Sequence, residues 1–135
     1  MFKLTLSMVV LLCLGCSTLK EEFGVKSLLK KYEWFKNASA QLDAKLASLK
    51  AYSARKKAMV ESYKDTPRRD WAREDREQFN LWEIEMAGLK ANYNNLAASY
   101  NSQMAKVNWR FANVGGLPEG ASEPLPREYR EYMEN

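Results

Sequence analysis

A heptad pattern of apolar residues constrains the fold of this chain more than any other feature. Between Val25 and Tyr63 the sequence contains no glycine or proline. Side chains recur there in alternating steps of four and three: Leu28, Tyr32, Phe35, Leu42, Leu46, Leu49, Val60 and Tyr63, with Ser39, Ser53 and Lys56 as polar interruptions. This spacing places them along one face of an α-helix. It therefore predicts one long helix over residues 25–64.

A second stretch repeats the same spacing after a proline. Its seam positions are Phe79, Trp82, Met86, Leu89, Tyr93, Leu96, Tyr100, Met104, Val107 and Phe111. Pro67 separates the two stretches, because proline removes a helical hydrogen bond and disfavours helical geometry in the residue before it. We expect Thr66 to be the N-cap and Pro67 the first residue of a helix over 67–112. The glycines of Asn113–Gly116 then end that helix.

Two long helices joined by a short connection must lie antiparallel, since the connection cannot reach back along their length. The predicted fold class is all-α: a long, coiled-coil-like, antiparallel two-helix hairpin over residues 25–114. A tail rich in proline and glycine follows over residues 115–135. With 135 residues the chain is expected to form one domain. The polar seam positions leave room for more helices, so a dimer or a small bundle remains open.

The first residues have the outline of a signal peptide. Lys3 precedes an apolar run from Leu4 to Leu14, and the small residue Gly15 follows it. The run is shorter than the roughly 20 residues that a helix needs to cross a bilayer. We therefore expect residues 1–15 to be a cleaved leader.

The sequence Leu11–Cys16, LLCLGC, resembles the lipobox of bacterial lipoproteins. It departs from that pattern at Cys13 and Leu14, where the family usually has leucine and a small residue. The resemblance implies a lipid on Cys16, a short tether over residues 16–24 and a place in the bacterial cell envelope. Ser17 after the cysteine implies the outer membrane, facing the periplasm, if the host is Gram-negative. Ordinary signal cleavage and an uncleaved anchor remain alternatives.

Composition argues against the familiar catalytic and metal-binding classes. The chain has no histidine, and of its cysteines Cys13 would leave with the leader while Cys16 would be lipidated. We therefore expect no enzyme activity, cofactor or metal. The carboxylates at 70–77 stand among arginines and are interpreted as an exposed first helical turn. Positive charge gathers in the first helix, either as a solvated face or as a surface for anionic head groups. Its basic runs are too short to predict nucleic-acid binding.

Two Tyr-Asn pairs lie one heptad apart in the second helix, at Tyr93-Asn94 and Tyr100-Asn101. One interpretation is that the tyrosines pack in the seam and the asparagines face water. The alternative is a polar, aromatic ledge for a partner. This paired Tyr-Asn helix, ahead of a Pro/Gly tail, also loosely resembles the final helix of LemA-like membrane-associated proteins, which implies no active-site residues.

The tail contains further candidate partner-binding residues, Pro124, Pro126 and Tyr129. Pro124 to Arg127 outwardly resembles a polyproline ligand. We favour a tail that folds back over Trp109 and Phe111.

Taken together, the sequence predicts a lipid-anchored helical envelope lipoprotein that acts as a non-catalytic scaffold or adaptor through protein–protein contact. Its expected partners are the membrane, through the lipid on Cys16, and an envelope protein or a second copy of itself. One alternative is a phage-exclusion or membrane-perturbing lipoprotein. Another is a small ligand-binding domain or enzyme, which would need a concave pocket.

Overall fold

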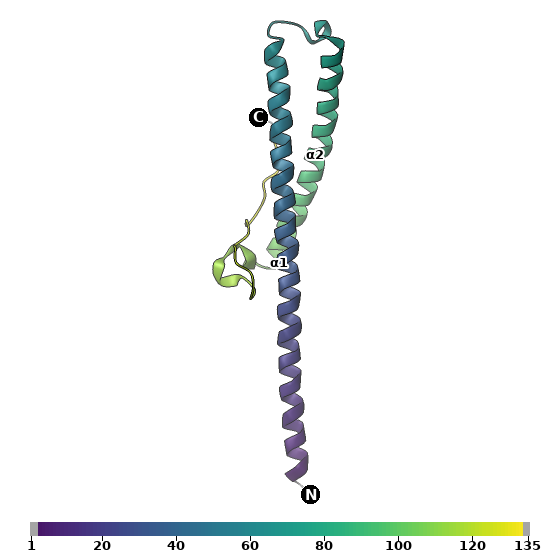
Figure 1. The fold of residues 1–135 in the computed structure, drawn as a ribbon. Helices are drawn as coiled ribbons and strands as arrows, with labels where there is room; N and C mark the ends of the chain where they lie inside the picture. The colour runs from purple at the N-terminus through teal and green to yellow at the C-terminus, as the bar shows by residue number, and fades with distance from the viewer. Residues whose placement is uncertain (1–2, 134–135) are drawn as a thin grey trace.

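The computed structural model describes the backbone of residues 3–133 and the side chains of residues 24–133. Two long helices dominate it, α1 over Lys3–Ser62 and α2 over Arg73–Lys106, and they pack against each other as an antiparallel hairpin (Figure 1). Three short 3₁₀ turns complete the elements, η1 at Arg68–Asp70, η2 at Arg110–Ala112 and η3 at Val114–Gly116. Residues 3–133 contain no strand. The prediction of an all-α hairpin is confirmed.

Helix α1 begins earlier than the sequence pattern suggested. The backbone of residues 16–24, expected to form a tether, is helical here. Residues 3–24 contain no proline, and Gly15 and Gly24 each cost a helix only about 1 kcal/mol relative to alanine, so nothing local stops it. The predicted leader over residues 1–15 and the lipid on Cys16 fall on residues whose side chains the structure does not describe. Among the described residues, no helix combines the length and apolarity that crossing a membrane requires.

The connection between the helices differs from the predicted Thr66-Pro67 start. Pro67 precedes η1 instead, and α2 begins only at Arg73. The reason is an aromatic pair: the Trp71 ring stacks on Tyr63 with 4.6 Å between centroids. The Trp71 indole N–H also donates to the Thr66 carbonyl at 3.0 Å. These contacts hold the chain in a wider turn than local capping alone would give.

The heptad seams form the core, as predicted. Buried side chains from both helices and from the turn after α2 make one cluster: Tyr32, Phe35, Ala38, Leu42, Leu49, Met86, Tyr93, Ala97, Tyr100, Met104 and Phe111. Val60, predicted on the seam, is 50% exposed. The seam therefore opens toward the connection.

Helix α2 ends at Lys106, before the predicted position 112. Asn108 and Trp109 adopt left-handed backbone angles, with φ of 53° and 51°, and they reverse the chain. The reversal places Phe111 between the helices, 0% exposed, with its ring 5.7 Å from the Tyr32 ring. Phe111 is thus a core residue, as the pattern indicated, but it reaches the core from a turn. Gly116 fits here because an added Cβ would lie 2.2 Å from the Arg110 carbonyl oxygen.

The tail folds back onto the hairpin, as the favoured interpretation predicted. The Leu125 N–H donates to the Phe111 carbonyl at 2.8 Å, and the Arg127 guanidinium lies 3.6 Å from the centre of the Trp109 ring. From there the tail is extended and runs beside the helices toward their connection (Figure 1).

Candidate functional site

The two Tyr-Asn pairs of α2 lie under the tail. Tyr93 and Tyr100 are 3% and 0% exposed, which agrees with packing in the seam. Asn94 and Asn101 are half-buried, and both bind the tail, so they do not face water as one interpretation had it. The aromatic and polar ledge exists, and this chain's own tail occupies it.

Asn101 holds the tail as a neighbouring β-strand would. Its amide Nδ2 donates to the Tyr129 carbonyl at 2.8 Å, and its Oδ1 accepts from the Tyr129 N–H at 2.8 Å. Both main-chain groups of one residue are therefore satisfied by one side chain. Asn94 repeats half of this arrangement, since its Oδ1 accepts from the Tyr132 N–H at 2.9 Å.

The spacing of the two asparagines matches the spacing of their targets. One heptad of α-helix rises about 10.5 Å. The two tail residues, Tyr129 and Tyr132, are three residues apart, and an extended chain advances about 10 Å over three residues. A helix with Asn at i and i+7 can therefore bind an extended chain at every third residue.

Three tyrosine hydroxyls add further main-chain contacts. Tyr100 donates to the Pro126 carbonyl at 2.6 Å and Tyr93 donates to the Arg130 carbonyl at 3.1 Å. Tyr32, on α1, donates to the Glu123 carbonyl at 2.7 Å. Buried hydroxyls need partners, and here the tail supplies them. Both helices therefore hold the tail.

Tyr129 is the tail side chain most deeply engaged. Its ring meets the Tyr100 ring edge-on, with 5.0 Å between centroids. Its hydroxyl lies 2.7 Å from the Ser39 hydroxyl and donates to an Asp43 carboxylate oxygen at 3.2 Å. The polar residue Ser39, which interrupts the apolar seam of α1, is therefore a partner for the tail.

Burial favours the protonated form of Tyr93, Tyr100 and Tyr129. It raises the pKa of Tyr100 well above its ordinary value, and the nearby Tyr129 and Asp43 raise that pKa further. Burial is also the main cause of the raised pKa of Tyr93 and of Tyr129. The hydroxyls therefore remain hydrogen-bond donors throughout the neutral pH range.

We call this surface the tail groove. Its members are Tyr32, Ser39, Asp43, Tyr93, Asn94, Tyr100 and Asn101. The structure brings the predicted residues of α2 together with Pro126 and Tyr129, whereas Pro124 is exposed and follows Glu123, whose carbonyl accepts from Tyr32. Sequence reasoning missed Tyr32, Asp43 and Tyr132, and the polar Ser39 within an apolar seam was the one signal that pointed to α1.

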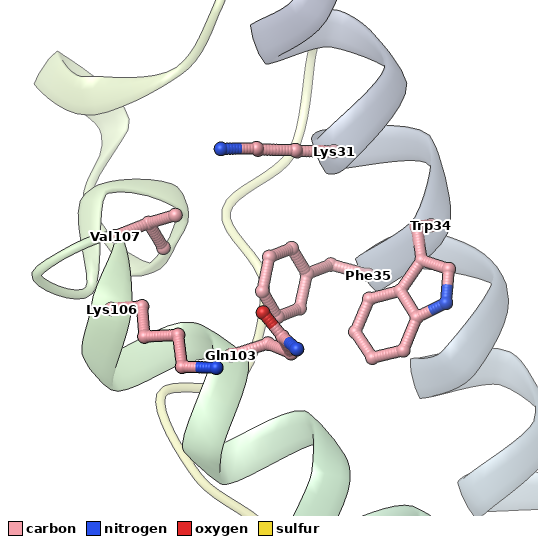
Figure 2. A pocket seen from close by; sticks show the side chains of 6 residues that line it. All are labelled: Lys31, Trp34, Phe35, Gln103, Lys106 and Val107. Carbon is pink, nitrogen blue, oxygen red and sulfur yellow. The ribbon is translucent and has the colours of Figure 1, made fainter.

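A second surface lies at the end of the hairpin away from the connection. A hollow of about 390 Å³ is lined by Lys31, Trp34, Phe35, Gln103, Lys106 and Val107. In Figure 2, Lys31 and Phe35 extend from α1 toward Gln103, Lys106 and Val107 at the end of α2. Trp34 is 41% exposed and packs edge-on against Phe35. The hollow therefore combines an exposed indole with two lysines.

The acidic residues at the start of α2 contact their neighbours. Asp75 accepts a hydrogen bond from the Tyr63 hydroxyl, and Glu77 pairs with Arg73 at 2.8 Å. Within the described residues, no group of three or more Cys, Asp or Glu side chains is arranged to hold a metal ion. Comparisons with protein-family models, curated proteins and solved structures found no match to this chain.

Proposed function

We propose that this chain is a lipid-anchored helical lipoprotein of the bacterial envelope, which acts as a non-catalytic scaffold or adaptor. The lipid on Cys16 would hold the chain at the membrane, and the hairpin would present its surfaces to other envelope proteins. The anchor part of the proposal is supported by the LLCLGC sequence at residues 11–16.

The observation that carries the contact role is the tail groove. Its tyrosine hydroxyls and asparagine amides are aimed at the main chain of an extended peptide. Main-chain hydrogen bonds combined with fitted side chains are the chemistry of peptide recognition. This arrangement suits the binding of an extended polypeptide.

The hollow beside Trp34 supports the same role from a different face. Tryptophan is enriched among the residues that contribute most to protein–protein binding. Neither Lys31 nor Lys106 has an ion-pair partner among the described residues. A partner with an acidic and apolar surface fits this hollow, because it would cover the indole and pair with the lysines.

One experiment tests both halves of the proposal in native membranes. Cys16→Ala should abolish labelling by radioactive palmitate and release the protein from membranes. A photoreactive phenylalanine derivative in place of Trp34 should give discrete crosslinked protein adducts in the anchored chain.

The matched control places the same probe at Ile84, which is 71% exposed on α2. Ile84 should give few adducts. Unchanged membrane association of the Cys16→Ala chain would contradict the anchor. Equal crosslinking at positions 34 and 84 would contradict a specific contact surface.

A further inference from the structure

The tail groove forms most of its hydrogen bonds to the main chain of the tail and few to its side chains. Tyr32, Tyr93 and Tyr100 donate to tail carbonyls, and the two asparagines bind the main chain of Tyr129 and Tyr132. Groups that bind main chain accept any segment that can extend along them. The groove therefore offers the same hydrogen-bond partners to any extended segment that reaches it.

Side chains limit which extended segments fit. The Tyr129 ring and hydroxyl are held by Tyr100, Ser39 and Asp43. The Tyr132 ring meets Tyr93 edge-on, with 6.5 Å between centroids. The segment that fits thus has two tyrosines three residues apart, as this chain's tail has.

Charge favours the same occupant. Residues 115–135 carry two Lys/Arg against five Asp/Glu, whereas residues 20–64, most of α1, carry eleven against five. An acidic tail therefore meets a basic helix. This attraction is the same whether the tail comes from the same copy or from another.

The connection between the hairpin and the clamped segment is long enough to reach a neighbour. Phe111 is fixed in the core and clamping begins at Glu123, which leaves residues 112–122 between them. Eleven extended residues span up to about 36 Å. Two packed helices are each about 10 Å in diameter, so a hairpin is about 20 Å wide. In this structure the stretch is folded by η3 and by a turn in which the Ala121 N–H donates to the Pro118 carbonyl at 3.1 Å, so these turns must open for the tail to cross to the groove of an adjacent copy.

We propose that the tail groove binds the tail of a second copy of this chain, so that two copies exchange residues 123–132 and form a dimer. Exchange between identical chains reproduces every contact that residues 123–132 make within one chain, so it sacrifices only the hydrogen bonds of the turns within residues 112–122. The local concentration, set against the cost of opening those turns, decides between the two arrangements. This inference rests in part on the proposed function, because a shared membrane anchor would concentrate the copies.

Complementary variants test the exchange in the full-length chain. The groove variant carries Asn94→Ala and Asn101→Ala and keeps an intact tail. The tail variant carries Tyr129→Ala and Tyr132→Ala and keeps an intact groove. When the two are co-expressed with different tags, each pair still contains one intact groove and one intact tail, so they should co-purify.

Two copies of the groove variant, or two copies of the tail variant, should co-purify at least about tenfold less. Every pairing of the groove variant loses the asparagine hydrogen bonds to the main chain, and every pairing of the tail variant loses the ring and hydroxyl contacts of both tyrosines. The control variant carries Asn92→Ala and Asn95→Ala. It removes exposed amides of the same helix and should associate like the unaltered chain. Circular dichroism should show that all variants keep their helices.

A synthetic peptide of residues 121–133 should disrupt the complementary pair, and the same peptide with alanine at 129 and 132 should not. Equal co-purification of all pairs, or none in any pair, would overturn the exchange. The same assay with purified Cys16→Ala chains at high concentration separates the two proposals. Complementary association there supports exchange even if the anchor fails, and its absence overturns exchange even if the anchor holds.

Discussion

The two halves of the hairpin share one heptad pattern but differ in what covers them. Where the tail lies on the helices, Leu42, Leu49 and Tyr100 are each 0% exposed. Toward the connection, where the tail is absent, the seam residue Val60 is 50% exposed. Two helices alone have only one contact face each and leave the edges of a seam open. In this molecule the tail closes those edges as a third layer.

The half next to the connection is covered by cations instead. Lys56 and Arg68 lie 5.3 and 4.4 Å from the centre of the Phe79 ring. Glu83 pairs with both, at 3.7 Å from Lys56 and 3.2 Å from Arg68. Long cationic side chains can shield an aromatic ring while their charges stay in water. This cover is weaker than the tail, because solvent screens exposed ion pairs.

Truncating the centre of the covered half should have the largest effect. Phe111→Ala would leave a cavity between the helices, where Phe111 meets Tyr32 and Phe35. We expect a loss of about 3–5 kcal/mol in the free energy of unfolding, measured by urea denaturation. Val60→Ala, the control in the other half, should change it by less than about 0.5 kcal/mol. Equal losses would show that the two halves are buried alike.

Alkaline pH should loosen the covered half. The pKa of Tyr93, of Tyr100 and of Tyr129 is raised in the folded chain, mainly by burial. Their contribution to stability is therefore complete below the ordinary tyrosine pKa, near 10, and declines as the pH rises above it. Limited proteolysis after Arg127 and Arg130 should thus accelerate above about pH 10. In Tyr100→Phe, which has one fewer titrating group, the stability should fall less steeply with pH, and an unchanged slope would contradict this cause.

Removing charge from the half next to the connection should have the smallest effect. Glu83→Gln deletes two ion pairs in which the side chains of Glu83 and Arg68 are 44% and 45% exposed and that of Lys56 is 18% exposed. We expect a loss of about 0–1 kcal/mol in the free energy of unfolding. In 1 M salt the difference from the unaltered chain should vanish, because charges are then screened beyond about 3 Å. A loss that persists in high salt would mean that Glu83 supports the structure by packing.

The sequence was informative where periodicity carried the signal. The heptad steps predicted both helices and most of their buried residues, since burial along a long helix repeats regularly. The start of α2 was not predicted, because the stack of Tyr63 on Trp71 outweighs the local capping preference of Thr66. The end of α2 was missed for a similar reason. Burying Phe111 requires the chain to reverse at Asn108 and Trp109, whereas the local sequence favoured termination at the glycines of Asn113–Gly116.

The sequence indicated the components of the tail groove but not their contact with one another. The Tyr-Asn repeat and the proline-rich tail could each be recognised alone, but an asparagine on a helix has the same local sequence whether it binds water or a peptide. The partnership between Asn101 and Tyr129 depends on where a turn after α2 directs the chain. That direction comes from tertiary contacts that no local pattern encodes.

The match between a helical heptad and three extended residues also determines which changes of length the tail can accept. Insertions at the exposed Glu119 and Gly120 would lengthen a surface turn, and a longer loop costs little entropy. A single residue inserted between Tyr129 and Tyr132 would instead separate them by four positions, so one asparagine or one ring would lose its partner. The tail thus combines a stretch that tolerates changes of length with a short segment, Tyr129 to Tyr132, whose spacing is fixed by the pitch of α2.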